Sequence, residues 1–167
     1  NDFQYRCVVL HSQLELFNIT LKVSDDFCLF KKSIRVVFEQ AEKAGNAWRN
    51  DRWDSFTLVT PNWSIQLPGA RYDGNDPDGF LKKADVVAYF EGYVEKFNLP
   101  VQFKISVLEV APLEDGKGYQ VKTSGGTFQA KNVVMATGSF QKPKIPAFSA
   151  DIPQGVTQLH SGQYRNP

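Results

Sequence analysis

A glutamate that directly follows a predicted strand is the first residue with a specific chemical use. Residues 34–38, Ile-Arg-Val-Val-Phe, have the β-branched and aromatic composition of a strand, and Glu39 comes next. A carboxylate at the end of such a strand can accept hydrogen bonds from both ribose hydroxyls of an adenine dinucleotide. A solvated glutamate at a strand terminus is the common alternative, so the pattern leaves both interpretations open.

A glycine after a second predicted strand can meet the same kind of ligand. Residues 132–136 form a short apolar run with two valines, typical of a strand buried on both faces of a parallel sheet. Thr137 and Gly138 close this run, and glycine permits a sharp turn and a close approach of the backbone to a ligand. Open α/β sheets bind ligands at this carboxyl edge. An ordinary turn after a core strand is the alternative.

The segment Gly45-Asn46-Ala47-Trp48-Arg49 is a third candidate. Glycine and asparagine tolerate a positive φ angle better than most residues, which predicts a tight turn. Such a turn would direct Trp48 and Arg49 onto one site, where the indole can cover a flat heterocycle and the guanidinium can bind a phosphate. The alternative is a turn that carries a core tryptophan and a surface arginine.

Strand and turn patterns predict most of the elements that position these residues. Residues 6–10 and the alternating residues 19–24 are typical of strands. The alternation of residues 101–107 predicts either a strand pair or one bent strand. Glycine turns at residues 116–118 and 125–126 then predict a three-stranded antiparallel meander that leads into the strand before Thr137.

One helix and one irregular loop complete the prediction. Residues 83–97 place apolar side chains at helical spacing, and Asn98 and Pro100 end the helix. Residues 71–79 are rich in Asp, Gly and Pro, which predicts an irregular excursion. A loop of this kind is stable only if it is anchored or lines a pocket.

Composition limits the partners and the compartment. The length of 167 residues suggests one domain, and a net charge of +1 gives no electrostatic reason to expect nucleic acid binding. No run is apolar for long enough to cross a membrane, and we expect no signal peptide. Cys7 and Cys28 lack metal-ligand spacing, so we expect no metal site and a reducing, cytoplasmic location.

Several short motifs, taken in order and spacing, resemble the flavin-dependent monooxygenase family, in particular the small bacterial flavoproteins related to flavin-containing monooxygenases. The resemblance runs from residue 34 to residue 167. The motifs that carry it are Val36-Val37-Phe38-Glu39, Ala44-Gly45-Asn46-Ala47-Trp48-Arg49, Arg52-Trp53-Asp54-Ser55, Thr60-Pro61-Asn62-Trp63, Leu67-Pro68-Gly69, Ala136-Thr137-Gly138 and Gln158-Leu159-His160-Ser161 with Tyr164.

The resemblance implies an α/β fold with two Rossmann-like dinucleotide-binding domains of three layers, one for FAD and one for NADPH. We therefore expect residues 34–147 to form a partial FAD-binding domain with an inserted antiparallel β-meander at about residues 101–130. Residues 148–167 are expected to be a truncated connector to the NADPH domain. Residues 1–33 are expected to be an atypical N-terminal arm.

The resemblance also implies roles for individual residues. The residues expected to contact FAD are Glu39 at the adenosine ribose, Gly45, Trp48 and Arg49 near the flavin, Val107 through its backbone at the adenine, and Thr137 and Gly138 at a strand end. Asn62 is a candidate for hydrogen-bonding the oxygen-activated flavin, with a turn asparagine beside proline as the alternative. His160 and Tyr164 fall in a fingerprint at the domain junction, where the spacing from Gly155 is one residue longer than usual.

Two departures from the family pattern limit what we expect of this chain. FAD binding in the family needs a Gly-x-Gly-x-x-Gly loop roughly 20 residues before Glu39, near residues 19–27, whereas the chain has no glycine before Gly45. The chain also stops where the NADPH-binding half would begin. We therefore expect an incomplete member of the family.

The expected function follows from the resemblance and from these departures. The complete parent would use FAD, NADPH and O2 to oxygenate a small nucleophilic or ketone substrate, and this chain alone would be inactive. The alternative is a non-catalytic fragment or interaction module without a bound cofactor. The sequence determines neither the substrate nor the oligomeric state.

Overall fold

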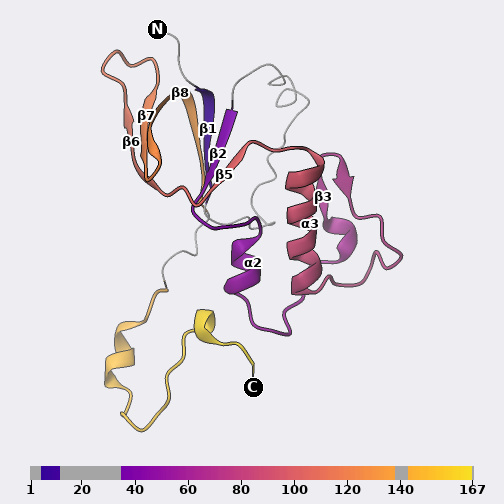
Figure 1. The fold of residues 1–167 in the computed structure, drawn as a ribbon. Helices are drawn as coiled ribbons and strands as arrows, with labels where there is room; N and C mark the ends of the chain where they lie inside the picture. Colours follow the sequence, from indigo (N-terminus) through magenta and orange to yellow (C-terminus); the bar gives the residue numbers. More distant parts are fainter. Residues whose placement is uncertain (1–4, 12–34, 138–142, 167) are drawn as a thin grey trace.

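A computed structural model describes residues 5–11, 35–137 and 143–166, and a mixed sheet forms the main part of it (Figure 1). The described residues contribute six strands to this sheet, in the order β5-β2-β1-β8-β7-β6. Its strands are β1 (Tyr5–His11), β2 (Arg35–Glu39), β5 (Val101–Phe103), β6 (Val107–Pro112), β7 (Tyr119–Thr123) and β8 (Gly126–Ala136). The helices α2 (Asn46–Asn50) and α3 (Lys83–Lys96) lie along the chain between the parallel strands β2 and β5, so the expected α/β class is confirmed.

Four strands, β5, β2, β1 and β8, are parallel to one another. The predicted strand at residues 6–10 is confirmed as β1, which lies between β2 and β8. This part of the expected N-terminal arm is therefore integral to the sheet. The predicted alternation at residues 19–24 lies outside the described residues.

Strands β6, β7 and β8 form the predicted antiparallel meander. Strand β8 is eleven residues long, and it pairs with β7 through its first half and with β1 through its second half. The pairing partner changes at Ala130, which is opposite both Tyr119 of β7 and Tyr5 of β1. One continuous strand thus joins the meander to the parallel half of the sheet.

The expected insert boundary at residue 101 is wrong. Residues 101–103 form β5 at one edge of the sheet, where they pair with β2, whereas β6 lies at the opposite edge. Lys104, between the two strands, has a φ angle of 60°, which ends the extended conformation. The meander therefore begins at Val107, and the alternation of residues 101–107 belongs to two strands rather than one.

The expected burial of residues 132–136 on both faces is also wrong. Ala136 is buried, but Met135 is 71% exposed. The core of the sheet consists of Val36 and Phe38 from β2, Val121 from β7 and Ala130 from β8, with partly buried residues packed against them. A short apolar run predicts a strand but does not reveal how many of its faces are covered.

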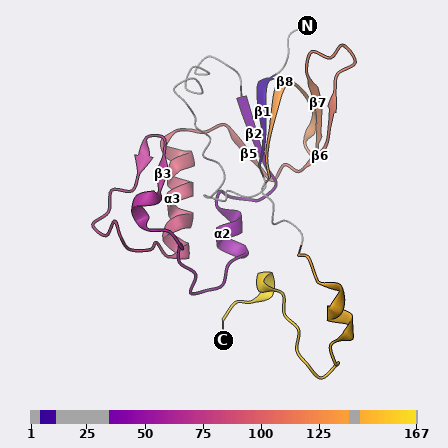
Figure 2. The ribbon, with the colours of Figure 1, turned by 180° about the vertical axis from the view of Figure 1, so that it is seen from behind.

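The helices α2 and α3 contribute to a second core, and they lie side by side in Figures 1 and 2. The buried residues of this core are Ala44, Trp48, Phe56, Leu58, Ile65, Val86, Val87 and Phe90. The predicted helix at residues 83–97 is confirmed as α3. Along the chain, the 3₁₀ turn η2 (Asn62–Ser64) and the hairpin of β3 (Gln66–Leu67) and β4 (Ala70–Arg71) come between the two helices.

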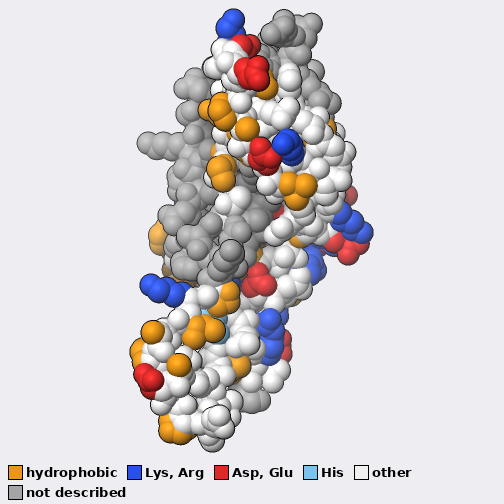
Figure 3. Space-filling model, turned by 90° about the vertical axis from the view of Figure 1, so that its left-hand side faces the viewer, with side chains coloured by type: hydrophobic (Ala, Val, Ile, Leu, Met, Phe, Trp, Pro, Cys, Tyr) orange, Lys and Arg blue, Asp and Glu red, His pale blue; other side chains and the backbone are white. Residues whose placement is uncertain are grey.

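Residues 143–166 extend away from the sheet, beyond its end nearer α2 (Figure 1). They contain two short 3₁₀ turns, η3 (Ala147–Asp151) and η4 (Ser161–Gln163). Hydrophobic side chains are exposed along this segment, as Figure 3 shows over the lower part of the molecule; they include Ile145, Phe148, Val156 and Leu159. Among the helices that the structure describes, none has the length and apolar character needed to span a bilayer.

Candidate functional site at the carboxyl edge of the sheet

The carboxyl ends of the parallel strands bring the predicted ligand-binding residues to one edge. Glu39, the last residue of β2, is aligned with Phe103 of β5 on one side and with His11 of β1 on the other. His11 is in turn aligned with Ala136, the last residue of β8. Because these strands are parallel, Glu39 and the Ala136–Thr137 strand end share one edge. Gly138 lies outside the described residues.

The Glu39 side chain has a defined position at this edge. Only 4% of the residue is exposed, and the backbone N–H of Ala41 donates a 2.8 Å hydrogen bond to its Oε1. A buried carboxylate needs such donors, because burial removes the water that would otherwise stabilise its charge. A carboxylate has about four acceptor positions, so this bond is compatible with further hydrogen bonds from a ligand.

The segment between β5 and β6 packs against the same strand end. The N–H of Ile105 donates to the carbonyl of Glu39 over 3.1 Å, and the N–H of Lys104 donates to the carbonyl of Ala41 over 3.0 Å. Val107 begins β6 two residues later and packs against the core that contains Phe38. The structure thus brings Glu39 and Val107, both expected near adenosine, into one neighbourhood.

The expected convergence of Trp48 and Arg49 on one site is wrong. Gly45 does have a positive φ angle, 70°, and it precedes the short helix α2. Trp48 is only 4% exposed and packs against Phe56, with ring centroids 5.4 Å apart, so its indole is a core group. Arg49 points to the surface and bonds Glu91 of α3 over 2.7 Å. Successive helical residues point in different directions, which explains the separation.

Asn62 has a structural position that agrees with the turn interpretation rather than with a role at a flavin. It is 3% exposed, its Nδ2 donates to the carbonyl of Asp76 over 2.8 Å, and its Oδ1 accepts from the N–H of Leu81 over 2.6 Å. Its backbone N–H donates to the carbonyl of Gly79. Asn62 therefore anchors the irregular loop at residues 71–79. This agrees with the prediction that the loop is either anchored or lines a pocket.

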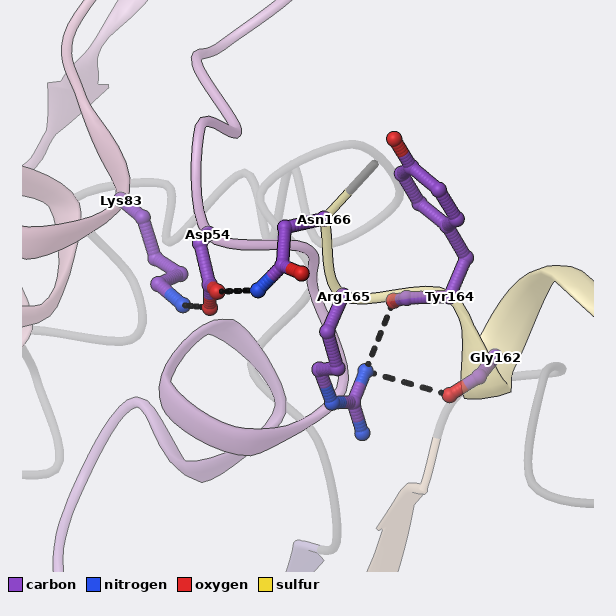
Figure 4. A network of polar contacts seen from close by, with 6 residues as sticks. All are labelled: Asp54, Lys83, Gly162, Tyr164, Arg165 and Asn166. Carbon is purple, nitrogen blue, oxygen red and sulfur yellow. Dashed lines mark hydrogen bonds and ion pairs between the residues drawn. The ribbon is translucent and has the colours of Figure 1, made fainter.

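A polar latch, formed by Asp54, Lys83, Arg165 and Asn166, holds the C-terminal segment (Figure 4). Asn166 Nδ2 donates to Asp54 Oδ2 over 2.7 Å, and the N–H of Asp54 donates to the carbonyl of Arg165 over 2.8 Å. Lys83 Nζ lies 3.6 Å from Asp54 Oδ1. The Asn166 amide, followed by the charge of Lys83, lowers the pKa of Asp54. No sequence pattern predicted this contact, because its partners are far apart in the chain.

His160 has a local role in the same segment. Its Nδ1 accepts a 3.0 Å hydrogen bond from the N–H of Gly162, and its N–H donates to Oε1 of Gln163. This arrangement caps the turn η4, with Tyr164 following it. Among the described residues, no group of three or more His, Cys, Asp or Glu side chains is arranged to hold a metal ion.

The edge fits one half of an adenine dinucleotide and not the other. Glu39 suits a ribose diol, as described above. A diphosphate needs a glycine-rich turn directly after the first strand, so that the backbone can approach the phosphates at a helix N-terminus. Because β1 ends at His11, such a turn would begin there rather than at residues 19–27, and the chain has no glycine before Gly45. The residue types present do not fit the diphosphate.

Comparisons with known proteins agree with this fold. Residues 35–167 match the family described as pyridine nucleotide-disulphide oxidoreductase. An uncharacterized oxidoreductase CzcO of Bacillus subtilis is 37% identical over 131 residues, which are 78% of this chain and 37% of that protein. The chain thus spans just over a third of the length of this relative.

Solved structures give the same result. A variant of a flavin monooxygenase from Stenotrophomonas maltophilia superimposes with a TM-score of 0.73 and 25% identity, over 96% of this chain and 46% of that one. An oxidized steroid monooxygenase bound to NADP has a TM-score of 0.68 and 19% identity, over 86% of this chain and 28% of that one. The second likeness concerns the fold alone.

Proposed function

Because the chain belongs to the pyridine nucleotide-disulphide oxidoreductase family, we propose that it carries the adenosine-binding part of a flavin-dependent monooxygenase. The resemblance to flavin-containing monooxygenases and the Rossmann-like fold class are confirmed by the matches above. The observation that carries the proposal is the position of Glu39 at the carboxyl edge, in line with the ends of β1 and β8. Ligands of open α/β sheets bind at this edge.

The proposed activity of the whole protein is NADPH- and O2-dependent oxygenation of a small nucleophilic or ketone substrate. FAD would supply the redox chemistry and the activation of oxygen. The residues of this chain would bind and orient: Glu39 would accept hydrogen bonds from the adenosine ribose, and the strand end at Thr137 and Gly138 would line the same slot. The backbone beside Val107 would meet the adenine. We assign no proton-transfer role to any side chain of the edge.

We further propose that this chain by itself has no catalytic activity. Without a glycine-rich turn after β1, the diphosphate of FAD loses several charge-assisted hydrogen bonds, each contributing about 1.5–3 kcal/mol. The loss of even one such bond weakens binding about tenfold or more, since about 1.4 kcal/mol corresponds to a factor of ten. FAD would then bind weakly, through its adenosine end.

An FAD titration of the purified chain tests the proposed site. We expect weak, saturable binding that desalting removes, and we expect Glu39→Ala to weaken it at least tenfold because the ribose loses its acceptor. Glu42→Ala is the matched control, since Glu42 lies three residues away and is an exposed partner of Lys104. Equal affinity of Glu39→Ala and the unchanged chain would refute the ribose assignment. No FAD binding at all would favour the non-catalytic alternative.

A further inference from the structure

The hairpin of β3 and β4 is too short to be stable by itself. Each strand has two residues, and the strands are joined by two residue pairs, Gln66 with Arg71 and Leu67 with Ala70. Even longer two-stranded hairpins are only marginally stable in water, so another element must hold this one. In both ribbon views β3 lies on the side of α3 that faces away from α2 (Figures 1 and 2).

Helix α3 holds the tip of this hairpin through side chains. Three consecutive carbonyls of the hairpin accept hydrogen bonds from α3: Pro68 from the Tyr93 hydroxyl over 3.2 Å, Gly69 from Lys96 Nζ over 3.2 Å, and Ala70 from the Tyr89 hydroxyl over 2.6 Å. The three donors are about one helical turn apart, so they share one face of α3. Because the donors are side chains, these bonds can break without disturbing the backbone hydrogen bonds of the helix.

Gly69 lets the tip of the hairpin lie close to the end of α3. Its φ angle is 73°, a conformation that residues with a Cβ atom rarely adopt. A Cβ atom at this position would lie 2.8 Å from Cζ of Phe97, which directly follows α3. The closed position of the hairpin therefore depends on a glycine at its turn as well as on the three donors.

We infer that residues 66–71 form a strap that opens as a unit while α3 and the sheet remain folded. Segments with few buried apolar contacts open at a lower free energy than a core. Leu67 of the strap and Tyr72 beside it are only partly buried against the second core, whereas Val86 and Phe90 of α3 are buried within it. Opening of the strap would uncover this side of the second core. The inference is independent of the role proposed for Glu39.

Amide hydrogen exchange of the full chain, followed by NMR, tests the inference. The N–H of Tyr72 reports on the strap, because it donates to the carbonyl of Ile65 across the base of the hairpin. We expect this amide to exchange at least about tenfold faster than that of Phe90 in the middle of α3. Tyr89→Phe should raise the Tyr72 rate about fivefold and leave the Phe90 rate unchanged, because one of the three bonds is lost. Tyr119→Phe, which removes the hydroxyl of an exposed tyrosine in β7, is the matched control and should change neither rate.

A second variant acts on the strap without removing a donor. Gly69→Ala, checked by circular dichroism for an intact fold, should also raise the exchange rate of Tyr72 and not that of Phe90. Equal rates of the two amides in the unchanged chain would overturn the inference, because the hairpin would then open only together with α3. A variant that raised both rates equally would also overturn it, since the fold as a whole would have lost stability. An unchanged Tyr72 rate in both Tyr89→Phe and Gly69→Ala would show that α3 does not hold the strap.

Discussion

At the scale of single residues, Asn62 shows how one buried amide can organise a loop without regular structure. Its side chain bonds the backbone at Asp76 and at Leu81, while its own N–H bonds Gly79. Backbone groups in a loop have no regular partners, so an amide with both a donor and an acceptor can satisfy two of them at once. The loop at residues 71–79 therefore owes its conformation to a residue outside it.

We expect Asn62→Ala to destabilise the fold by about 2–3 kcal/mol, because the carbonyl of Asp76 and the N–H of Leu81 lose their partners. Urea denaturation monitored by tryptophan fluorescence measures this loss. Asn50→Ala is the control, since the Asn50 amide bonds only the exposed side chain of Asn46 among the contacts described. Asn62→Asp should also be destabilising, because it keeps the acceptor for Leu81 but places a carboxylate oxygen against the carbonyl of Asp76. Equal stability of Asn62→Ala and the unchanged chain would contradict the anchoring role.

The same scale shows where residue type alone was informative. Glu39 at its strand end and the positive φ angle of Gly45 agree with the sequence prediction, because strand ends and positive φ angles are local properties. Trp48 and Arg49 were predicted to share a site, but each side chain contacts a different neighbour. The indole packs against Phe56, which lies outside the turn, and the guanidinium is paired with Glu91 of α3, which is distant in sequence.

At the scale of elements, the latch around Asp54 joins the C-terminal segment to the loop after α2 (Figure 4). The contact combines a backbone hydrogen bond from Asp54 to Arg165 with a side-chain bond from Asn166 to Asp54. The segment from residue 143 onward has many exposed hydrophobic side chains and no described strand. Polar contacts, rather than a core, therefore hold its end in place.

We expect Asp54→Ala to increase hydrogen–deuterium exchange of residues 161–166 about fivefold, because the Asn166 amide loses its acceptor. The segment should loosen rather than detach, because the Asp54 N–H still donates to Arg165. Exchange in α3 should not change, and Asp73→Ala, at an exposed position of another loop, is the control. Unaltered exchange at the C-terminal segment would show that the latch contributes nothing.

Low pH should loosen the latch in the same way as Asp54→Ala. The Asn166 amide and Lys83 lower the pKa of Asp54 below its ordinary value of 3.8. Because the pKa is lower in the folded form, ionised Asp54 stabilises that form at pH values above 3.8. This stabilisation is lost as the pH falls through the lowered pKa. The protection at residues 161–166 should therefore persist from pH 7 to pH 4 and decrease only at lower pH.

At the scale of the whole molecule, the chain resembles part of a longer type of protein. It spans 37% of the Bacillus subtilis relative and 46% of the Stenotrophomonas maltophilia structure. Glu39 lies at the carboxyl edge of the sheet, whereas the sequence between β1 and β2 contains no glycine. Family membership and catalytic competence are therefore separate questions for this chain.

We expect no NADPH oxidation by the purified chain above the rate with free FAD alone, because FAD is not held by its diphosphate. Absorbance at 340 nm with excess FAD and NADPH measures this rate, with a complete flavin monooxygenase as the positive control. A rate that rises in proportion to the concentration of the chain, and that falls in Glu39→Ala, would contradict the proposed inactivity.

The sequence alone determined the local elements and the family. Periodicity predicted β1, α3 and the meander, and the position of Glu39 after a strand predicted a place at a sheet edge. These features depend on residues close together in the chain, where alternation and helical spacing have a direct structural meaning.

The tertiary structure decided what depends on distant partners. It joined the meander to the parallel strands through one continuous β8, buried Trp48, made Asn62 an anchor, and paired Asp54 with Asn166. Each of these outcomes requires two segments far apart in sequence to meet, and that meeting follows from the path of the entire chain. Local residue patterns contain no record of that path, so only the folded molecule reveals it.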